Sequence, residues 1–74
     1  MSKIFLEKFS KKLKKTREEK GFTQDILACD SGISRSTISM VEIGKRDLTL
    51  SKLEMIAAAL GVEPYELLKF DEQP

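Results

Sequence analysis

The chain has 74 residues, a formal net charge of +1, one cysteine and no histidine, which excludes an internal disulfide and a zinc site with histidine or paired cysteine ligands. A core of this size supplies only about 3–5 kcal/mol, so we expect a partner subunit to add stability. Residues 1–20 hold eight Lys/Arg and three Glu, and residues 47–74 hold two Lys and six acidic residues, an asymmetry that fits either attraction to a polyanion or a solvated lysine-rich helix face.

Apolar residues recur at spacings of three and four, without the period-two alternation of strands, so the chain is predicted to be helical. The first helix is expected from about Ser2 to Lys20. Gly21 follows it, at a point where a helix end favours a residue that tolerates positive φ. The expected buried face of this helix consists of Ile4 or Phe5, Phe9, Leu13 and the methyl group of Thr16.

Two short helices are predicted next, each opened by a hydroxyl side chain and closed by a glycine. Thr23 is the expected N-cap of a helix from Gln24 to about Ser31, and Ser34 is that of a helix from Arg35 to Ile43. The side chains expected inside are Leu27 and Ala28 from the first and Ile38 and Val41 from the second, with Cys29 buried or half-buried.

Two further helices complete a single predicted domain of residues 1–70. Thr49 is the expected N-cap of the fourth helix, Gly61 ends that helix, and Pro64 suits the first turn of a short fifth helix. The polar residues 71–74 are expected to form a short flexible tail. The expected apolar stripe of the fourth helix is Leu50, Leu53, Ile56, Ala57 and Leu60, and the fifth helix contributes Tyr65, Leu67 and Leu68.

The segment from Thr23 to Arg46 carries the functional signal. Its two helices are separated by about three residues that include Gly32, a spacing that lets the second helix cross the first at a steep angle. Ala28 is small enough to allow the close approach, and Ile38 and Val41 lie one turn apart on the inward side. This combination is more typical of a helix-turn-helix than of an arbitrary helical bundle.

At these residues the sequence resembles the Cro/phage-repressor (Xre) family of helix-turn-helix proteins, over roughly Leu13 to Leu68. The resemblance implies an all-α, five-helix, lambda-repressor-like bundle that binds double-stranded DNA as a homodimer and regulates transcription. Within the family, the chain is similar to the short controller proteins of restriction-modification systems. The motif pieces are Lys20-Gly21-Phe22-Thr23-Gln24, Ser31-Gly32-Ile33-Ser34, Thr37-Ile38-Ser39, Val41-Glu42-Ile43-Gly44-Lys45-Arg46 and Leu53-Glu54-Met55-Ile56-Ala57.

The outward face of the third helix is the predicted base-reading surface, because the reading helix of such proteins enters the major groove by its N-terminal part. Arg35 is the strongest candidate, since its planar guanidinium can donate two hydrogen bonds to guanine O6 and N7. Met40 contacts a thymine methyl group or merely covers the neighbouring helix. The full predicted base-reading set is Arg35, Ser36, Thr37, Ser39 and Met40.

A second set of residues is predicted to contact phosphates, which position a protein on DNA without reading sequence. The resemblance implies that Gln24 binds a phosphate and braces the reading helix, at a helix N-terminus that already favours an anion. It also implies a structural salt bridge between Arg17 and Glu42. The predicted phosphate contacts are Thr23 (or this residue is a cap only), Gln24, Ser34, Lys45 and Arg46.

The C-terminal part of the chain is the predicted dimer interface. Two copies would place their reading helices in successive major grooves, about 34–36 Å apart, on a two-fold or pseudo-palindromic operator. Alternatively, the last apolar residues fold back on their own subunit. The predicted interface residues are Leu48, Leu50, Tyr65, Leu68 and Phe70.

Other functions and partners are expected to be absent. The glycines are single helix stops and no histidine exists, so no enzyme activity, cofactor, metal or small-molecule ligand is predicted. No apolar run reaches signal-peptide or membrane-span length, which predicts a cytoplasmic protein without membrane contact. Asp25 and Asp30 are candidates for a contact with RNA polymerase. The alternative function is a phage- or plasmid-type repressor, or an antitoxin whose helix-turn-helix works mainly through protein–protein contacts.

Overall fold

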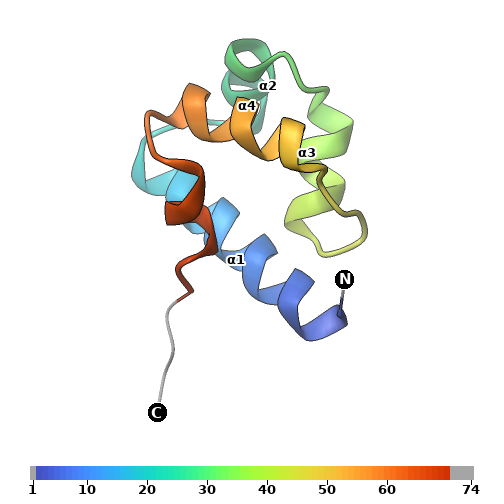
Figure 1. The fold of residues 1–74 in the computed structure, drawn as a ribbon. Coiled ribbons are helices and arrows are strands. Elements are labelled where there is room, and N and C mark those ends of the chain that lie inside the picture. The colour runs from blue at the N-terminus through green and yellow to red at the C-terminus, as the bar shows by residue number, and fades with distance from the viewer. Residues whose placement is uncertain (1, 71–74) are drawn as a thin grey trace.

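Four α-helices and a terminal 3-10 helix form the fold of residues 2–70, the part of the chain that the computed structural model describes (Figure 1). The elements are α1 (Lys3–Glu19), α2 (Gln24–Ser31), α3 (Arg35–Glu42), α4 (Leu50–Leu60) and the 3-10 helix η1 (Pro64–Leu68). None of the described residues lies in a strand, which confirms the all-α prediction. The expected tail, residues 71–74, lies outside the described residues.

The short fifth helix of the prediction is a 3-10 helix, so the bundle has four α-helices among its described residues, not five. Glu63 and Glu66 form a capping box around Pro64, and the chain is already extended at Lys69. Only five residues lie between these limits. The backbone closes i→i+3 hydrogen bonds there, from Glu66 to Glu63 and from Lys69 to Glu66, which is the usual pattern of such short pieces.

A hydroxyl side chain caps each α-helix, as predicted for α2, α3 and α4, and Ser2 does the same for α1. The cap oxygen accepts a hydrogen bond from the backbone N–H three residues later in all four cases, which involve Ser2, Thr23, Ser34 and Thr49. Gly32 ends α2 with φ of 78°, a backbone conformation that L side chains rarely adopt. This glycine therefore allows the sharp turn from α2 into α3.

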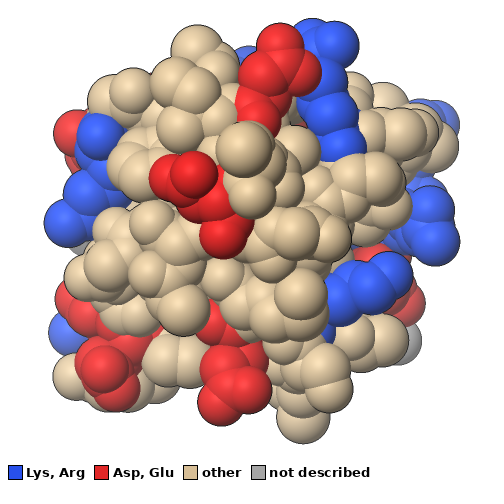
Figure 2. Space-filling model, turned by 90° about the horizontal axis from the view of Figure 1, so that it is seen from above, with Lys and Arg blue, Asp and Glu red and all other residues tan. Residues whose placement is uncertain are grey.

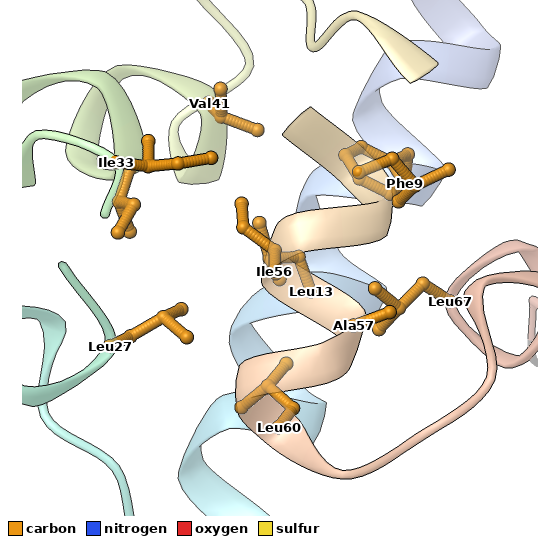
Figure 3. Close-up of a cluster of buried hydrophobic side chains, with 11 residues drawn as sticks. Phe9, Leu13, Leu27, Ile33, Val41, Ile56, Ala57, Leu60 and Leu67 are labelled. Atoms are coloured by element: carbon orange, nitrogen blue, oxygen red, sulfur yellow. The ribbon is translucent and has the colours of Figure 1, made fainter. Parts of the chain in front are cut away.

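One apolar core receives side chains from α1, α2, α3, α4 and η1 and from the turn between α2 and α3 (Figure 3). Ile38 and Val41 of α3 are fully buried, as predicted, so the inward side of this helix is fixed. The core residues are Phe9, Leu13, Leu27, Ile33, Ile38, Val41, Leu53, Ile56, Ala57, Leu60 and Leu67.

Several residues expected inside lie nearer the surface. Ala28 is only half-buried and Cys29 is exposed, because α2 packs on α3 and α4 mainly through Leu27, and Cys29 lies on the outer side of the helix. Leu50 is 81% exposed, since it is the first residue of α4 and lies before the part of the helix that meets the core. The first turn of α1 likewise leaves Ile4 exposed.

Candidate nucleic-acid interface

The outer side of α3 is polar and accessible. The Arg35 side chain is 62% exposed at the first position of the helix, and Ser36 beside it is also exposed. Met40 is 39% exposed, and Ser39 is half-buried. Since Ile38 and Val41 hold the opposite side in the core, α3 presents a rigid polar surface to its surroundings.

Thr37 lies at the buried edge of this surface, which does not favour its predicted base-reading role. Its residue is 7% exposed, and its hydroxyl oxygen accepts a hydrogen bond from the Ser34 hydroxyl at 2.9 Å. The Ser34 oxygen in turn accepts the Thr37 backbone N–H. The Ser34 hydroxyl hydrogen is therefore occupied inside the protein, which also argues against the predicted side-chain contact from Ser34 to a phosphate.

A buried ion pair joins α1 to the end of α3. Arg17 donates two hydrogen bonds to the Glu42 carboxylate, from Nε to Oε2 at 2.7 Å and from Nη2 to Oε1 at 3.0 Å. Its third nitrogen, Nη1, donates to the carbonyl of Phe22 at 2.8 Å. The hydrogen bonds to Glu42 raise the pKa of Arg17 above its ordinary value, although burial acts in the opposite direction. Arg17 is therefore charged at any pH that the protein meets.

Gln24 completes this network from the start of α2. Its side-chain Nε2 donates to Glu42 Oε1 at 3.0 Å, so the amide braces α3 from the side of α2. The predicted brace is thus present in the geometry. A phosphate at this helix end would meet the backbone N–H groups of the first turn, where the helix dipole favours an anion.

Sequence reasoning missed a second contact between α2 and α3. Arg35 Nε lies 3.1 Å from Asp25 Oδ1 in an ion pair, and the two side chains are 62% and 76% exposed. The two residues are ten positions apart, and no spacing rule connects them. The only signal in the sequence is the opposite charge of two residues near the starts of adjacent helices.

The loop after α3 supplies the remaining predicted contacts. Lys45 and Arg46 are both exposed and directly follow the helix, whose end is closed by a backbone hydrogen bond from Lys45 N–H to the Met40 carbonyl. Asp47 is exposed beside them. Thr23 accepts the Ile26 backbone N–H and keeps its own hydroxyl hydrogen as a donor.

The lysines of α1 form a separate feature. Four of them line a surface hollow of about 340 Å³ together with Phe70, namely Lys8, Lys11, Lys12 and Lys15. Of these, Lys11 also adjoins the end of α3, where it shares a shallower hollow with Glu42 and Ile43. Figure 2 shows another face, the one uppermost in Figure 1, where acidic side chains lie near the centre and also toward the lower edge, and Lys/Arg side chains lie mainly toward the sides.

The predicted dimer residues divide into two groups. Leu50, Tyr65 and Leu68 are 81%, 62% and 40% exposed. Leu48 packs against the core of its own chain, and the Phe70 ring meets Phe5 edge-to-face at 5.2 Å between centroids. An almost entirely apolar hollow of about 220 Å³ lies among these elements, lined by Phe5, Phe9, Leu48, Leu50, Leu53 and Leu68.

Two further features of residues 2–70 concern membrane spans and metal sites. No helix in this part of the chain combines the length and the apolar character required to cross a bilayer. The same residues contain no group of three or more His, Cys, Asp or Glu side chains placed to hold a metal ion.

Comparison with known proteins places the chain among regulators. Residues 13–67 match the helix-turn-helix family. A hypothetical transcription factor of Neisseria meningitidis is 44% identical over 52 residues, a match that covers 70% of this chain and 49% of the relative. The chain thus spans about half of the length of that protein.

Two solved structures of restriction-modification controller proteins are similar in both fold and sequence. C.AhdI from Aeromonas hydrophila has a TM-score of 0.82 and 42% identity, and the match covers 84% of this chain and 94% of that one. C.Esp1396I, crystallised as a tetramer on its natural 35 base-pair operator, has a TM-score of 0.79 and 42% identity, with 86% and 88% coverage.

Proposed function

The chain belongs to the helix-turn-helix family, as its resemblance to the Cro/phage-repressor group predicted, and from this premise we propose that it is a sequence-specific regulator of transcription. It binds double-stranded operator DNA as a homodimer, and its place is that of a controller protein in a restriction-modification system. The observation that carries the proposal is the outer side of α3, where Arg35 and its polar neighbours lie accessible on a helix anchored by Ile38 and Val41.

The exposed residues of α3 make the contacts with the bases. Arg35 donates to guanine O6 and N7, and Ser36 lies beside it at the end of the helix that enters the groove first. The Met40 side chain makes an apolar contact with a thymine methyl group. Half-buried Ser39 is close enough to the surface for a hydrogen bond to a base edge or a phosphate.

Phosphate contacts come from both sides of α3. The first turn of α2 offers backbone N–H groups, with the Thr23 hydroxyl next to them. Lys45 and Arg46 offer cations beyond the other end of the helix. The Gln24 side chain contributes by fixing the angle between α2 and α3 through Glu42.

We expect residues 1–70 to form one domain that acts in the cytoplasm without enzymatic activity or a cofactor. If the protein activates transcription, exposed Asp30 at the C-terminal end of α2 is the candidate contact for RNA polymerase. Asp25 is the weaker candidate, because its carboxylate is paired with Arg35.

Selecting bound duplexes from a random pool tests the proposal as a whole. A dimeric regulator enriches a palindromic or pseudo-palindromic site with half-sites one helical turn apart. A module that works through protein–protein contacts enriches no sequence and shows little affinity for duplex DNA at any salt concentration.

Removing Arg46 is expected to change the salt dependence of DNA binding. The logarithm of the binding constant falls with the logarithm of salt concentration by about 0.9 per phosphate contact, so Arg46→Ala reduces the slope by about one at every sequence and leaves base preference unchanged. Lys69→Ala removes the same charge near the C-terminus and serves as the control. Equal slopes in wild type and Arg46→Ala remove this residue from the interface.

A charge at Leu50 is expected to separate the subunits. Leu50 is 81% exposed at the rim of the apolar hollow, and burying a carboxylate there without a partner is strongly unfavourable. Leu50→Glu should therefore be monomeric in sedimentation experiments at concentrations where the wild type is dimeric. Ile26→Glu places the same charge at an exposed apolar residue of α2 and should stay dimeric. A dimeric Leu50→Glu variant would show that the interface lies elsewhere.

A further inference from the structure

The first two residues of α2 contact both ends of one side of α3. Gln24 hydrogen-bonds Glu42, the last residue of α3, and Asp25 pairs with Arg35, the first. Arg35 and Glu42 are seven residues apart, so they lie on the same side of the helix, two turns from each other. The start of α2 therefore holds this side of α3 at two points.

The two contacts differ in what they do. Glu42 is 8% exposed and also accepts a hydrogen bond from Arg17. Its contact with Gln24 is therefore part of the buried network that fixes the position of α3. The pair of Asp25 with Arg35 is mostly exposed and fixes a side chain instead. An exposed pair of this kind adds little to stability, and its effect is on where the guanidinium points.

We propose that Asp25 is a specificity-determining residue that positions Arg35 to read guanine, an inference that rests on the proposed function. The carboxylate forms its ion pair at Arg35 Nε, 3.1 Å away, which leaves the terminal nitrogens of the guanidinium to donate to guanine O6 and N7. A free arginine samples many rotamers, and a side chain held in place before binding loses less entropy on binding. By holding the guanidinium in place, Asp25 thus increases the preference of Arg35 for guanine.

The local electrostatics support this role. Arg35 occupies the first position of α3, a helix with no acidic residue in its first turn, and the helix dipole disfavours a cation there. Asp25 lies in the first turn of α2, where the dipole favours an anion. Its carboxylate therefore holds a cation at a helix end that would otherwise repel it.

The same carboxylate must oppose general binding to DNA, because it adds a negative charge beside the phosphates. A positioning role therefore has two effects of opposite sign. Loss of the charge strengthens binding to random duplex DNA and weakens the preference for one base pair. An acid that merely stabilised the start of α2 would alter neither base preference nor the balance between the two kinds of DNA.

The test compares Asp25→Asn with the wild type on three duplexes: the selected operator, the same operator with the guanine read by Arg35 replaced, and random sequence. The base pair is identified beforehand as the one whose preference is lost in Arg35→Ala. In Asp25→Asn the ratio of affinities for the first two duplexes should fall by about three- to tenfold, a part of the discrimination that a bidentate arginine provides. Affinity for random sequence should rise.

Asp30→Asn is the matched control, because it removes the same charge from an exposed position of the same helix, whereas the ion pair of Arg35 is with Asp25. It should leave the discrimination ratio unchanged. Asp25→Glu keeps the carboxylate and should retain more discrimination than Asp25→Asn. Thermal unfolding of each variant establishes that it is folded at the assay temperature.

The outcomes separate this inference from the proposed function. If Arg35→Ala loses base preference but Asp25→Asn keeps or increases it, Asp25 merely occupies Arg35 in the free protein and the inference is wrong, whereas the proposed function stands. If the wild type itself shows no preference among sequences, both are wrong.

Discussion

Replacing Glu42 with alanine is expected to lower the free energy of unfolding by about 3–5 kcal/mol, because Arg17 would stay buried without its partner. The Arg17 residue is 7% exposed, and two of its three nitrogens donate to the Glu42 carboxylate. Gln24 would lose its acceptor as well. This loss is as large as the stability expected of a core of this size, so about half of the Glu42→Ala monomers should be unfolded at 25 °C.

Chemical denaturation monitored by circular dichroism measures the effect. Glu54→Ala is the control, because Glu54 is an exposed acid in the middle of α4, and such a change normally stays within about 0.5 kcal/mol. The double variant Arg17→Met/Glu42→Met should be more stable than Glu42→Ala, since no buried charge is left unpaired. A Glu42→Ala variant as stable as the wild type would show that the pair contributes nothing to holding α3.

Local rules explain why much of the fold is readable in the sequence. Ser34 and Thr49 act as caps through hydrogen bonds that reach only three residues along the chain. Gly32 is required by its own backbone angle, and the inward side of α3 follows from the spacing of Ile38 and Val41. None of these features depends on where a distant element lies.

The errors arise where a neighbouring element decides the outcome. Thr37 is a local exception, because periodicity places it at the edge of the outer face of α3 but its side chain is buried and hydrogen-bonded to Ser34, the cap of the same helix. Cys29 is exposed because α2 turns another side toward α4. The contact between Asp25 and Arg35 depends on how the start of α2 lies across α3, an angle that no local pattern specifies.

The base-reading surface was therefore predictable in its position but not in the ion pair that Arg35 forms there. Arg35 could be identified from its position at the start of the reading helix, because that position alone makes it accessible. What the sequence could not provide was its partner. The behaviour of an exposed arginine depends on that partner as much as on its own position.

Arg35→Ala is expected to weaken binding to the operator by about 1–3 kcal/mol and to remove the preference at one base pair in each half-site. The physical reason is that the guanidinium alone on this surface can donate two parallel hydrogen bonds to guanine, while Ser36 has a single donor. Lys45→Ala is the comparison: as a phosphate contact it should weaken binding about equally at all sequences and reduce the salt slope. Titrations against the operator and its single-base variants distinguish the two patterns.

A uniform loss in Arg35→Ala would assign this arginine to the DNA backbone and move base reading to Ser36, Ser39 and Met40. The salt dependence of the lost affinity also distinguishes a phosphate contact from a base contact. A phosphate contact at the start of α3 loses most of its effect when salt is raised, whereas a bidentate contact with a base is much less sensitive to salt. Measuring both variants at two salt concentrations therefore decides the role of Arg35 even if the operator is known only approximately.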